Sequence, residues 1–311
     1  MTSAVPSTQT LRLSYRAWAE MTLLGVIWGA SFLSIKLALS EVPVMTLVAH
    51  RVFWACLLLW AYVIWRGLAV PRSPRIWGAF LVMGLLNNII PFSLMAWGQQ
   101  FIETGLTSIF NAATAVFGVL VAAMVFRDER LTLRRGLGVT IAFFGVVVAI
   151  GFESLADFDI RSLAQLAIVA GTLSYAVAAA WARVHLVGLP PQVAAAGMLT
   201  GASLVMVPLA WMIDGAPKMP TDPVTFAAIG YFAAFGTAIA YLLYYRILAM
   251  AGSGNAMLVT LLIPPVAILL GAAVLGERLD PSAFAGFALL AAGLLILDGR
   301  ALQIFRKSPP I

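Results

Sequence analysis

Charged residues are scarce in this chain, and their scarcity excludes most soluble folds. Only 10% of the 311 residues are Asp, Glu, Lys or Arg, whereas 62% are hydrophobic. An ordinary soluble domain carries roughly 25% charged residues, which it needs to cover its surface. The mean hydropathy of +0.99 agrees with this low charge. The composition therefore predicts a membrane protein.

The strict alternation of polar and apolar residues that marks barrel strands is also missing. Residues 57–63 form an unbroken apolar run, and similar runs recur along the chain. Outer-membrane barrels are built from short alternating strands, so this pattern excludes them. The chain is expected to cross the membrane as helices.

Cysteine and the common catalytic motifs are nearly absent. The single Cys56 excludes an intramolecular disulfide and a cysteine-based metal site. HExxH and GxSxG do not occur, and His50 lies far from His185 in the sequence. We therefore expect no enzyme activity, no metal site, no catalytic residue and no cofactor.

The net charge of +6 is distributed between apolar runs and forms no continuous basic cluster. A basic patch would favour nucleic acid, whereas dispersed Lys and Arg set the orientation of a membrane protein. The expected partners are a small-molecule substrate and the lipid bilayer, with no nucleic acid. The expected oligomeric state is a monomer or a weak dimer.

Ten apolar segments are long enough to be read as membrane spans, each of which needs about 20 residues. Short connectors rich in Pro, Gly and charge separate them. The polar N-terminus lacks the order of a signal peptide, so the first segment is expected to remain in the mature protein. The segments are Ala17–Ala38, Met45–Trp65, Ile76–Ala96, Gly105–Phe126, Gly136–Phe152, Leu163–Val184, Val193–Ile213, Phe226–Leu248, Asn255–Leu275 and Ala283–Leu297.

Basic residues orient these spans. With a cytoplasmic N-terminus, 14 of the 19 Lys and Arg residues fall on the cytoplasmic side. The positive-inside rule favours this arrangement. The sequence thus predicts a multi-pass protein of the bacterial inner membrane with both termini cytoplasmic. The five basic residues on the outer side are Lys36, Arg51, Arg161, Lys218 and Arg278.

The chain contains an internal repeat with an offset of 148 residues. This shift aligns Glu129-Arg130-Leu131 with Glu277-Arg278-Leu279, and it carries Gly138 onto Gly286 and Gly145 onto Gly293. Each half holds an odd number of spans, so the second copy enters the membrane from the opposite side. Inverted repeats enclose a midplane site and support alternating access. We predict two five-helix repeats, residues 1–152 and 153–311, which together form one transport domain.

Several segments resemble a known family. WGASFLSIK, AHRVFW and FRDERLTLRRGLGVTIAFFGVVVAI in the first half, and LLIPPVAILLGAAVLGERL with DPSAFAGFALLAAGLLIL in the second, resemble the two EamA repeats of the drug/metabolite transporter superfamily. The resemblance implies ten helices as two inverted repeats, cytoplasmic termini, and efflux of small metabolites, often amino acids. Within the superfamily, the length and the aromatic residues are similar to those of YddG-type aromatic amino-acid exporters. AHRVFW equally resembles RarD-like members, and exporters of threonine, homoserine, cysteine metabolites or drugs stay open as alternatives.

Polar and aromatic side chains within the spans are candidates for substrate contact. Asparagine offers a donor and an acceptor, while tyrosine and tryptophan offer flat apolar walls with a polar handle. The alternative for the polar ones is hydrogen bonding between helices. The candidates are Trp28, Asn87, Asn111, Thr114, Tyr175, Trp181, Tyr241 and Tyr245.

Two basic residues are candidates for a gate, and four prolines are candidates for hinges. Lys36 and Arg51 are read as a gate near the outer ends of their spans, with Glu41 or Glu103 as partners. The alternative is that both simply reach the membrane interface. Prolines break the helical hydrogen-bond ladder, which makes hinges of Pro91, Pro208, Pro264 and Pro265.

No Asp or Glu lies at the centre of a predicted span. Proton-coupled transporters commonly use an intramembrane carboxylate. Small multidrug transporters of the same superfamily carry one in their first helix, where this chain has WGASF. We therefore predict facilitated or exchange-type export of amino acids, aromatic ones favoured. The alternatives are a drug or non-aromatic metabolite exporter and a lipid flippase.

Overall fold

The computed structural model describes residues 15–127, 129, 131–151, 159–216, 220–256 and 259–298. Every regular element in this part of the chain is a helix, as the apolar runs predict. In the first half the elements are α1 (Tyr15–Ala38), α2 (Val44–Trp65), α3 (Pro74–Gly84), the π-helix η1 (Leu85–Ile89), α4 (Ile90–Gly98), α5 (Thr104–Ala112), α6 (Thr114–Val125) and α7 (Leu133–Ile150). In the second half they are α9 (Ile160–His185), α10 (Pro191–Asp214), α11 (Pro223–Ala233), the π-helix η2 (Ala234–Ile239), α12 (Ala240–Ala256), α13 (Val259–Leu275) and α14 (Pro281–Asp298).

Eight continuous helices of the described chain are long and apolar enough to cross a membrane. Three of them join several elements, namely Pro74–Gly98, Thr104–Val125 and Pro223–Ala251. Two further apolar helices, Val259–Leu275 and Pro281–Leu297, are shorter. They pack lengthwise with the others, since α13 contacts α1 and α5 while α14 contacts α7. The expectation of an all-helical membrane protein is therefore confirmed, with eight spans assigned by length.

The helix ends follow from local sequence. Proline occupies the first position of α3, α10, α11 and α14, where its missing N–H is not needed. Side chains cap the starts of α7, α9 and α11: Thr132 accepts from the backbone N–H of Arg135, Asp159 from that of Ser162 and Asp222 from that of Thr225. Each cap satisfies a backbone donor that the helix itself leaves free. These residues determine at which position each helix begins after its connector.

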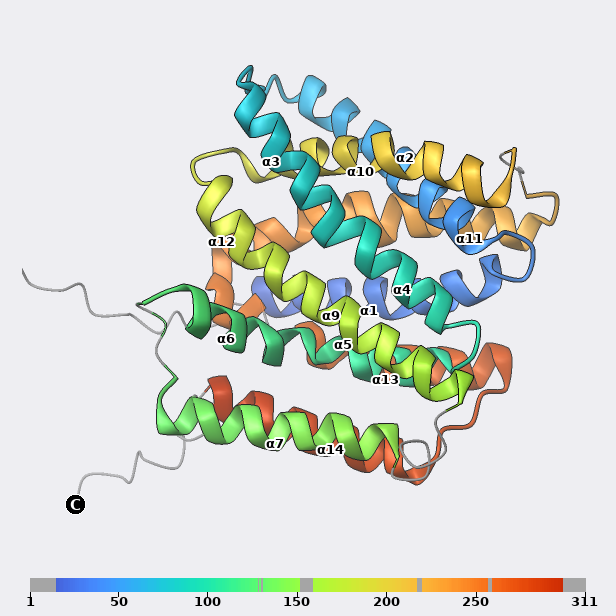
Figure 1. The fold of residues 1–311 in the computed structure, drawn as a ribbon, viewed down its shortest axis with the longest axis vertical. Coiled ribbons are helices and arrows are strands. Elements are labelled where there is room, and N and C mark those ends of the chain that lie inside the picture. The colour runs from blue at the N-terminus through green and yellow to red at the C-terminus, as the bar shows by residue number, and fades with distance from the viewer. Residues whose placement is uncertain are drawn as a thin grey trace, which may run out of the picture.

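Successive spans run in alternating directions across the bundle, with connectors at its left and right ends in Figure 1. The connector after α1 lies at the right, whereas the connector after α9 lies at the left. The first helices of the two halves therefore run in opposite directions. Helix contacts match across the halves too: α2 packs on α10, α7 packs on α14, and the α1–α13 pair has its counterpart in α9 against α5 and α6. Exchanging the halves leaves this set of contacts unchanged, as expected for two structural repeats.

The tight α7–α14 pair explains the glycines that the repeat aligns. A Cβ atom added to Gly145 would lie 2.6 Å from the Leu290 nitrogen, and one on Gly286 would lie 2.5 Å from the Ala149 nitrogen. Added to Gly293, a Cβ atom would lie 2.5 Å from the Ala142 nitrogen. Helices that approach this closely need small residues at the contact. The aligned glycines are thus packing residues of the last span in each half.

A π-helical turn interrupts the third span of each half at nearly equivalent positions. η1 ends directly before α4, whose second residue, Pro91, has no N–H for the helical ladder. The Leu86 carbonyl instead accepts a hydrogen bond from the Ser174 hydroxyl, at 2.7 Å. In η2 the Thr237 hydroxyl donates to the Phe232 carbonyl at 2.9 Å. π-turns inside α-helices frequently occur at functional sites, and both lie where the two halves meet.

The four predicted hinge prolines lie in different settings. Pro91 follows η1 and is buried, whereas Pro208 lies on an exposed face of an uninterrupted α10. Pro264 and Pro265 are both inside α13, the first buried and the second exposed. The positions of the first half that align with Pro264 and Pro265 are not prolines. The fourth span of the first half is nevertheless interrupted, at Ala113 between α5 and α6. The hinge role of all four prolines remains a prediction.

Candidate functional site

Arg51 of α2 points between two aromatic rings in the interior of the bundle. Its guanidinium carbon lies 3.3 Å from the centroid of the Phe92 ring and 3.8 Å from that of Phe232. Its Nε atom donates to the Thr237 hydroxyl at 2.9 Å. Stacking on aromatic faces suits the planar, weakly hydrated guanidinium. Residues from α4, α11 and η2 therefore hold this cation in one orientation.

The Arg51 charge has no acidic partner in the described chain. No Asp or Glu oxygen of a described residue forms an ion pair with it. The residue is half-buried, and its two terminal nitrogens are not among the described polar atoms that are fully enclosed without a partner. The hydroxyls of Tyr175 and Tyr241 lie close enough to interact with its charge. The terminal nitrogens are therefore not fully enclosed by the described residues.

Tyr241 of α12 connects the halves beside this cation. The Asn87 side-chain nitrogen donates to the Tyr241 hydroxyl at 3.2 Å, and that hydroxyl donates to the Asn88 side-chain oxygen at 3.0 Å. The Asn88 side-chain nitrogen is buried and has no partner among the described residues. Both asparagines lie on η1, so the irregular turn presents them to the second half. The arrangement leaves one buried donor free for a further acceptor.

Aromatic rings extend from this cluster in two directions. On one side, Tyr175 of α9 packs edge-on against Phe92, with ring centroids 6.4 Å apart. On the other side, Tyr245 contacts Tyr244 at 5.7 Å, and Tyr244 contacts Trp28 of α1 at 5.8 Å. Rings and polar groups together line the interior from α1, α4, α9 and α12. We call Trp28, Arg51, Asn87, Asn88, Phe92, Tyr175, Phe232, Thr237, Tyr241 and Tyr245 the interior cluster.

The structure brings together only some of the residues that the sequence proposed for substrate contact. Asn87, Tyr175, Tyr241 and Tyr245 lie in the interior cluster, and Trp28 is linked to the rest of it through the Tyr244 ring. Trp181 packs against the same buried residues as Tyr175, Tyr241 and Tyr245. The Trp181 indole N–H donates to the Ala79 carbonyl at 3.1 Å, and its ring lies 3.8 Å from that of His185.

The two span-four candidates lie on either side of a helix break. Asn111 and Thr114 flank the Ala113 break, and neither forms a hydrogen bond with the interior cluster in the described chain. The Thr114 hydroxyl is buried without a partner. Their proximity to a substrate therefore stays a prediction.

Sequence reasoning missed Phe92 and Phe232 and placed Arg51 too near the outer end of its span. The partners of Arg51 are not the expected Glu41 or Glu103, because Arg51 lies seven residues into α2. At 1.5 Å per residue this is about 10 Å along the helix axis. This depth of Arg51 in the span could have been obtained from the sequence, by counting residues from Pro43, which precedes the helix. No sequence signal pairs Arg51 with the two phenylalanines, because they belong to distant spans.

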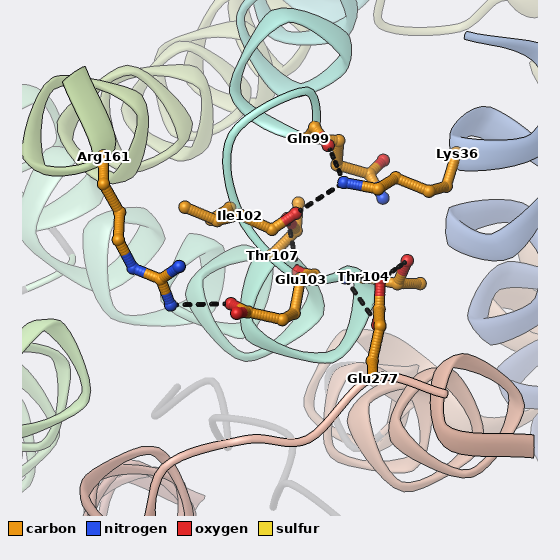
Figure 2. A network of polar contacts seen from close by, with 8 residues as sticks. All are labelled: Lys36, Gln99, Ile102, Glu103, Thr104, Thr107, Arg161 and Glu277. Atoms are coloured by element: carbon orange, nitrogen blue, oxygen red, sulfur yellow. Dashed lines mark hydrogen bonds and ion pairs between the residues drawn. The ribbon is translucent and has the colours of Figure 1, made fainter. Parts of the chain in front are cut away.

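A second polar network joins several helices at the end of the bundle where α1 stops (Figure 2). The Lys36 ammonium donates to the carbonyls of Gln99 and Ile102, the latter at 3.1 Å. The Gln99 side chain in turn donates to the Phe32 carbonyl at 3.1 Å. The end of α1 is thus fastened to the connector between α4 and α5. The hydrogen-bond partners of Lys36 are backbone carbonyls, while the carboxylates of Glu277 and Glu103 lie close enough to interact with its charge.

The same network ties the second half to this connector. Glu103 and Arg161 form an ion pair at 2.8 Å, and Glu277 accepts hydrogen bonds from the backbone N–H and hydroxyl of Thr104 at 2.9 to 3.0 Å (Figure 2). A pocket of about 410 Å³ lies beside the Glu103–Arg161 pair. We call Lys36, Gln99, Ile102, Glu103, Thr104, Arg161 and Glu277 the Lys36 network. It closes one end of the interface between the two repeats.

Two more contacts between the halves lie at this end. Asp214 accepts from the backbone N–H and the hydroxyl of Thr46, at 2.7 and 2.8 Å. Glu41 accepts from Thr221 and from the Asp222 backbone N–H. Hydrogen bonds from Thr221 hold the pKa of Glu41 below its ordinary value, because they stabilise the carboxylate. In the described chain, acidic side chains thus form their contacts at helix ends and not in the middle of the spans.

A multi-pass helical bundle with a polar interior and an end closed by polar contacts is the architecture of a membrane transporter, not of an enzyme. The sequence profile of the EamA-like transporter family matches residues 18–151 and 162–297. This chain belongs to that family, within the drug/metabolite transporter superfamily, and its two matched segments are the two repeats. It is a multi-pass membrane transporter of small metabolites.

Individual relatives agree with the family. A protein of Streptantibioticus cattleyicolor named "Probable terminal-alkyne amino-acid exporter" is 28% identical, over 96% of this chain and 98% of its own length. A protein of Escherichia coli named "Probable amino-acid metabolite efflux pump" is 25% identical, over 88% and 92%. One crystal structure superposes with a TM-score of 0.67 at 17% identity, covering 94% of this chain and 99% of that one. This last match supports the fold alone.

Proposed function

We propose that this transporter exports amino acids across the bacterial inner membrane and favours those with aromatic side chains. The observation that carries the proposal is the interior cluster, which combines aromatic walls with unpartnered polar groups. An aromatic amino acid needs a flat apolar surface for its ring and polar partners for its ammonium and carboxylate groups. Relatives named as an amino-acid exporter and an amino-acid metabolite efflux pump support the same substrate class.

Alternating access explains why both halves contribute to the cluster. Arg51 and Asn87 come from the first repeat, while Tyr175 and Tyr241 come from the second. Rocking of residues 1–152 against 153–311, as two inverted five-helix repeats with ten crossings, opens the cluster to each face in turn. The contact between Asn87 and Tyr241 crosses the moving interface, so it is well placed to respond to substrate. The proposed hinges are Pro91, Pro208, Pro264 and Pro265.

The Lys36 network acts as the gate on the periplasmic side in this proposal. It holds together α1, α9 and the start of α5 through an ammonium, an ion pair and a carboxylate. Because Arg51 lies in the interior cluster, we assign the gate to Lys36 and its partners and not to Arg51. The distribution of Lys and Arg favours an orientation with this end outside and both termini in the cytoplasm.

Transport proceeds as facilitated export or exchange. Within the described spans no carboxylate lies at mid-depth, and the acids near the span ends are engaged with basic or backbone groups. An intramembrane carboxylate is the usual proton carrier in coupled transporters. The substrate gradient therefore supplies the driving force.

Counterflow in proteoliposomes tests the proposal. Vesicles containing the full-length protein and unlabelled phenylalanine are diluted into labelled phenylalanine, tryptophan, threonine or a cationic dye. We expect labelled phenylalanine and tryptophan to accumulate transiently, threonine more weakly, and the dye not at all. Accumulation of the dye or threonine alone would favour a drug or non-aromatic metabolite exporter. Scrambling of a fluorescent phospholipid without amino-acid counterflow would favour a flippase.

A further inference from the structure

We infer that the terminal nitrogens of Arg51 bind the carboxylate of the transported molecule. The inference rests on the proposed function and narrows it, because it makes a free carboxylate a requirement for recognition. It assigns to Arg51 a binding role in place of the gate that its sequence position first indicated.

The geometry around Arg51 leaves only one edge for a ligand. The rings of Phe92 and Phe232 lie against the guanidinium, 3.3 and 3.8 Å from its carbon to their centroids, and Thr237 occupies the Nε donor. The remaining N–H groups on Nη1 and Nη2 form a planar fork with no partner among the described residues. A carboxylate matches this fork with two parallel hydrogen bonds. Because the rings and Thr237 hold the fork in place, little ordering cost remains for the ligand to overcome.

Charge favours an anionic ligand group at this position. A cation inside a membrane protein is costly unless a counter-charge accompanies it. No described Asp or Glu supplies that charge to Arg51. A bound carboxylate neutralises the guanidinium, whereas a cationic ligand without a carboxylate is repelled. This explains how an interior cluster rich in aromatic residues distinguishes amino acids from cationic drugs.

The ring of the substrate has a surface close to the anchor. Tyr175 packs against Phe92, which itself covers Arg51, so an aromatic side chain next to the carboxylate meets the Tyr175 face. The hydroxyl of Tyr175 forms no hydrogen bond within the described chain and remains available to the ligand. Carboxylate and ring are thus recognised by neighbouring residues of opposite repeats.

A purely structural role for Arg51 gives a different expectation. Arg51 also braces α2 against η2 through Thr237. If bracing were its whole function, replacing it would weaken all ligands equally. If it binds the carboxylate, replacing it removes the preference for carboxylates specifically. The ratio of affinities for an acid and its amide separates the two roles.

Calorimetric titration of the purified full-length protein measures that ratio. The ligands are phenylalanine, N-acetylphenylalanine and phenylalaninamide, of which only the first two carry a carboxylate. We expect the wild type to bind both carboxylates about 10- to 100-fold more tightly than the amide, as hydrogen bonds to charged groups predict. Arg51→Gln is expected to bring the ratio of carboxylate affinity to amide affinity near one. Arg51→Lys is expected to give an intermediate ratio. Arg75→Gln, at an exposed arginine of α3, is the matched control and keeps the wild-type ratio.

Two outcomes would overturn the assignment. The first is equal binding of acid and amide by the wild type, and the second is a wild-type ratio in a folded Arg51→Gln protein, with folding checked by circular dichroism and gel filtration. Arg51→Lys provides the same comparison if the glutamine variant does not fold. Binding of the cationic dye with no binding of any of the three phenylalanine ligands would overturn the proposed function as well.

Discussion

Single residues of the interior cluster join the two repeats, and Tyr241 is the clearest example. Its hydroxyl accepts from Asn87 and donates to Asn88, so one phenol oxygen on α12 satisfies two side chains of η1. Tyrosine can do this because its hydroxyl is both donor and acceptor. Phenylalanine at the same position would keep the ring and lose both bonds.

We predict that Tyr241→Phe weakens phenylalanine binding about 10-fold and lowers stability by about 1 kcal/mol. The stability loss is small because hydrogen bonds between membrane helices average under 1 kcal/mol. The affinity loss is larger because Asn87 and Asn88 lose the group that orients them. Calorimetric titration and thermal melting in detergent measure the two effects. Tyr15→Phe, at a side chain that is 97% exposed, is the control and should change neither.

The Glu41 carboxylate predicts a pH dependence of stability. Because Thr221 and Asp222 lower its pKa in the folded state, its stabilising effect is fully present above the pKa of the unfolded chain. The effect is lost as the pH falls through the lower folded-state value. Glu41→Gln removes this contribution, so its melting temperature should be below that of the wild type at pH 7. The difference should shrink toward pH 3, and a difference that stays constant between these pH values would refute the assignment.

Residue positions within one span could be predicted from sequence, whereas contacts between distant spans could not. The sequence singled out Asn87, Tyr175 and Tyr241 because polar and aromatic side chains at membrane depth tend to face the interior. It did not place Arg51 against Phe92 and Phe232, since that contact depends on how α2, α4 and α11 pack. It also grouped Trp181 with the site, although its indole N–H is engaged by Ala79.

At the scale of elements, the third span of each half shows how different sequences give the same irregularity. In the first half Pro91 disrupts the ladder directly after η1. In the second half no proline follows η2 within the span, and η2 contains Gly236, where an added Cβ would lie 2.4 Å from the Ser31 hydroxyl oxygen. Proline made the first interruption predictable. The second depends on the approach of α1, which is a tertiary contact that the sequence alone does not reveal.

The α7–α14 pair provides a prediction for a whole element. Gly286→Ala places a Cβ 2.5 Å from the Ala149 nitrogen and 2.6 Å from the Gly145 oxygen, so the two helices must move apart. We expect a stability loss of about 1 to 3 kcal/mol, as overpacking commonly gives. Thermal melting in detergent measures it.

Gly118→Ala in α6 is the matched control, because no atom lies within 4 Å of the added Cβ. Alanine in a helix interior is up to about 1 kcal/mol more favourable than glycine. We therefore expect this variant to equal or exceed the wild type in stability. Equal melting temperatures for the two alanine variants would show that the close approach of α7 and α14 does not limit stability.

At the scale of the whole molecule, hydropathy and the repeat determine most of the architecture. Long apolar runs gave the helices, and the shift of 148 residues matched the halves that pack against each other. Length alone assigns eight spans, because α13 and the apolar part of α14 have fewer than 18 residues.

The absence of a mid-depth carboxylate in the described spans leads to a prediction for coupling. We expect phenylalanine counterflow in proteoliposomes to change less than about 2-fold when a protonophore removes the pH gradient, since no acidic group is placed to carry a proton through the interior. The initial rate of labelled phenylalanine entry measures this. Transport that stops without a pH gradient would contradict exchange or facilitated export.

Accessibility of the interior cluster from both membrane faces tests the central claim of one site opened alternately to each side. Cys56 is the single cysteine, so Cys56→Ala with Tyr245→Cys gives one reporter thiol. Arg75→Cys in the same background serves as a control that only the cytoplasmic face should label. The measurement is the labelling rate of each thiol by a membrane-impermeant reagent in right-side-out and inside-out vesicles. We expect position 245 to label in both preparations and phenylalanine to slow both rates. Labelling from one face alone, unaffected by phenylalanine, would rule out a site that opens to both sides.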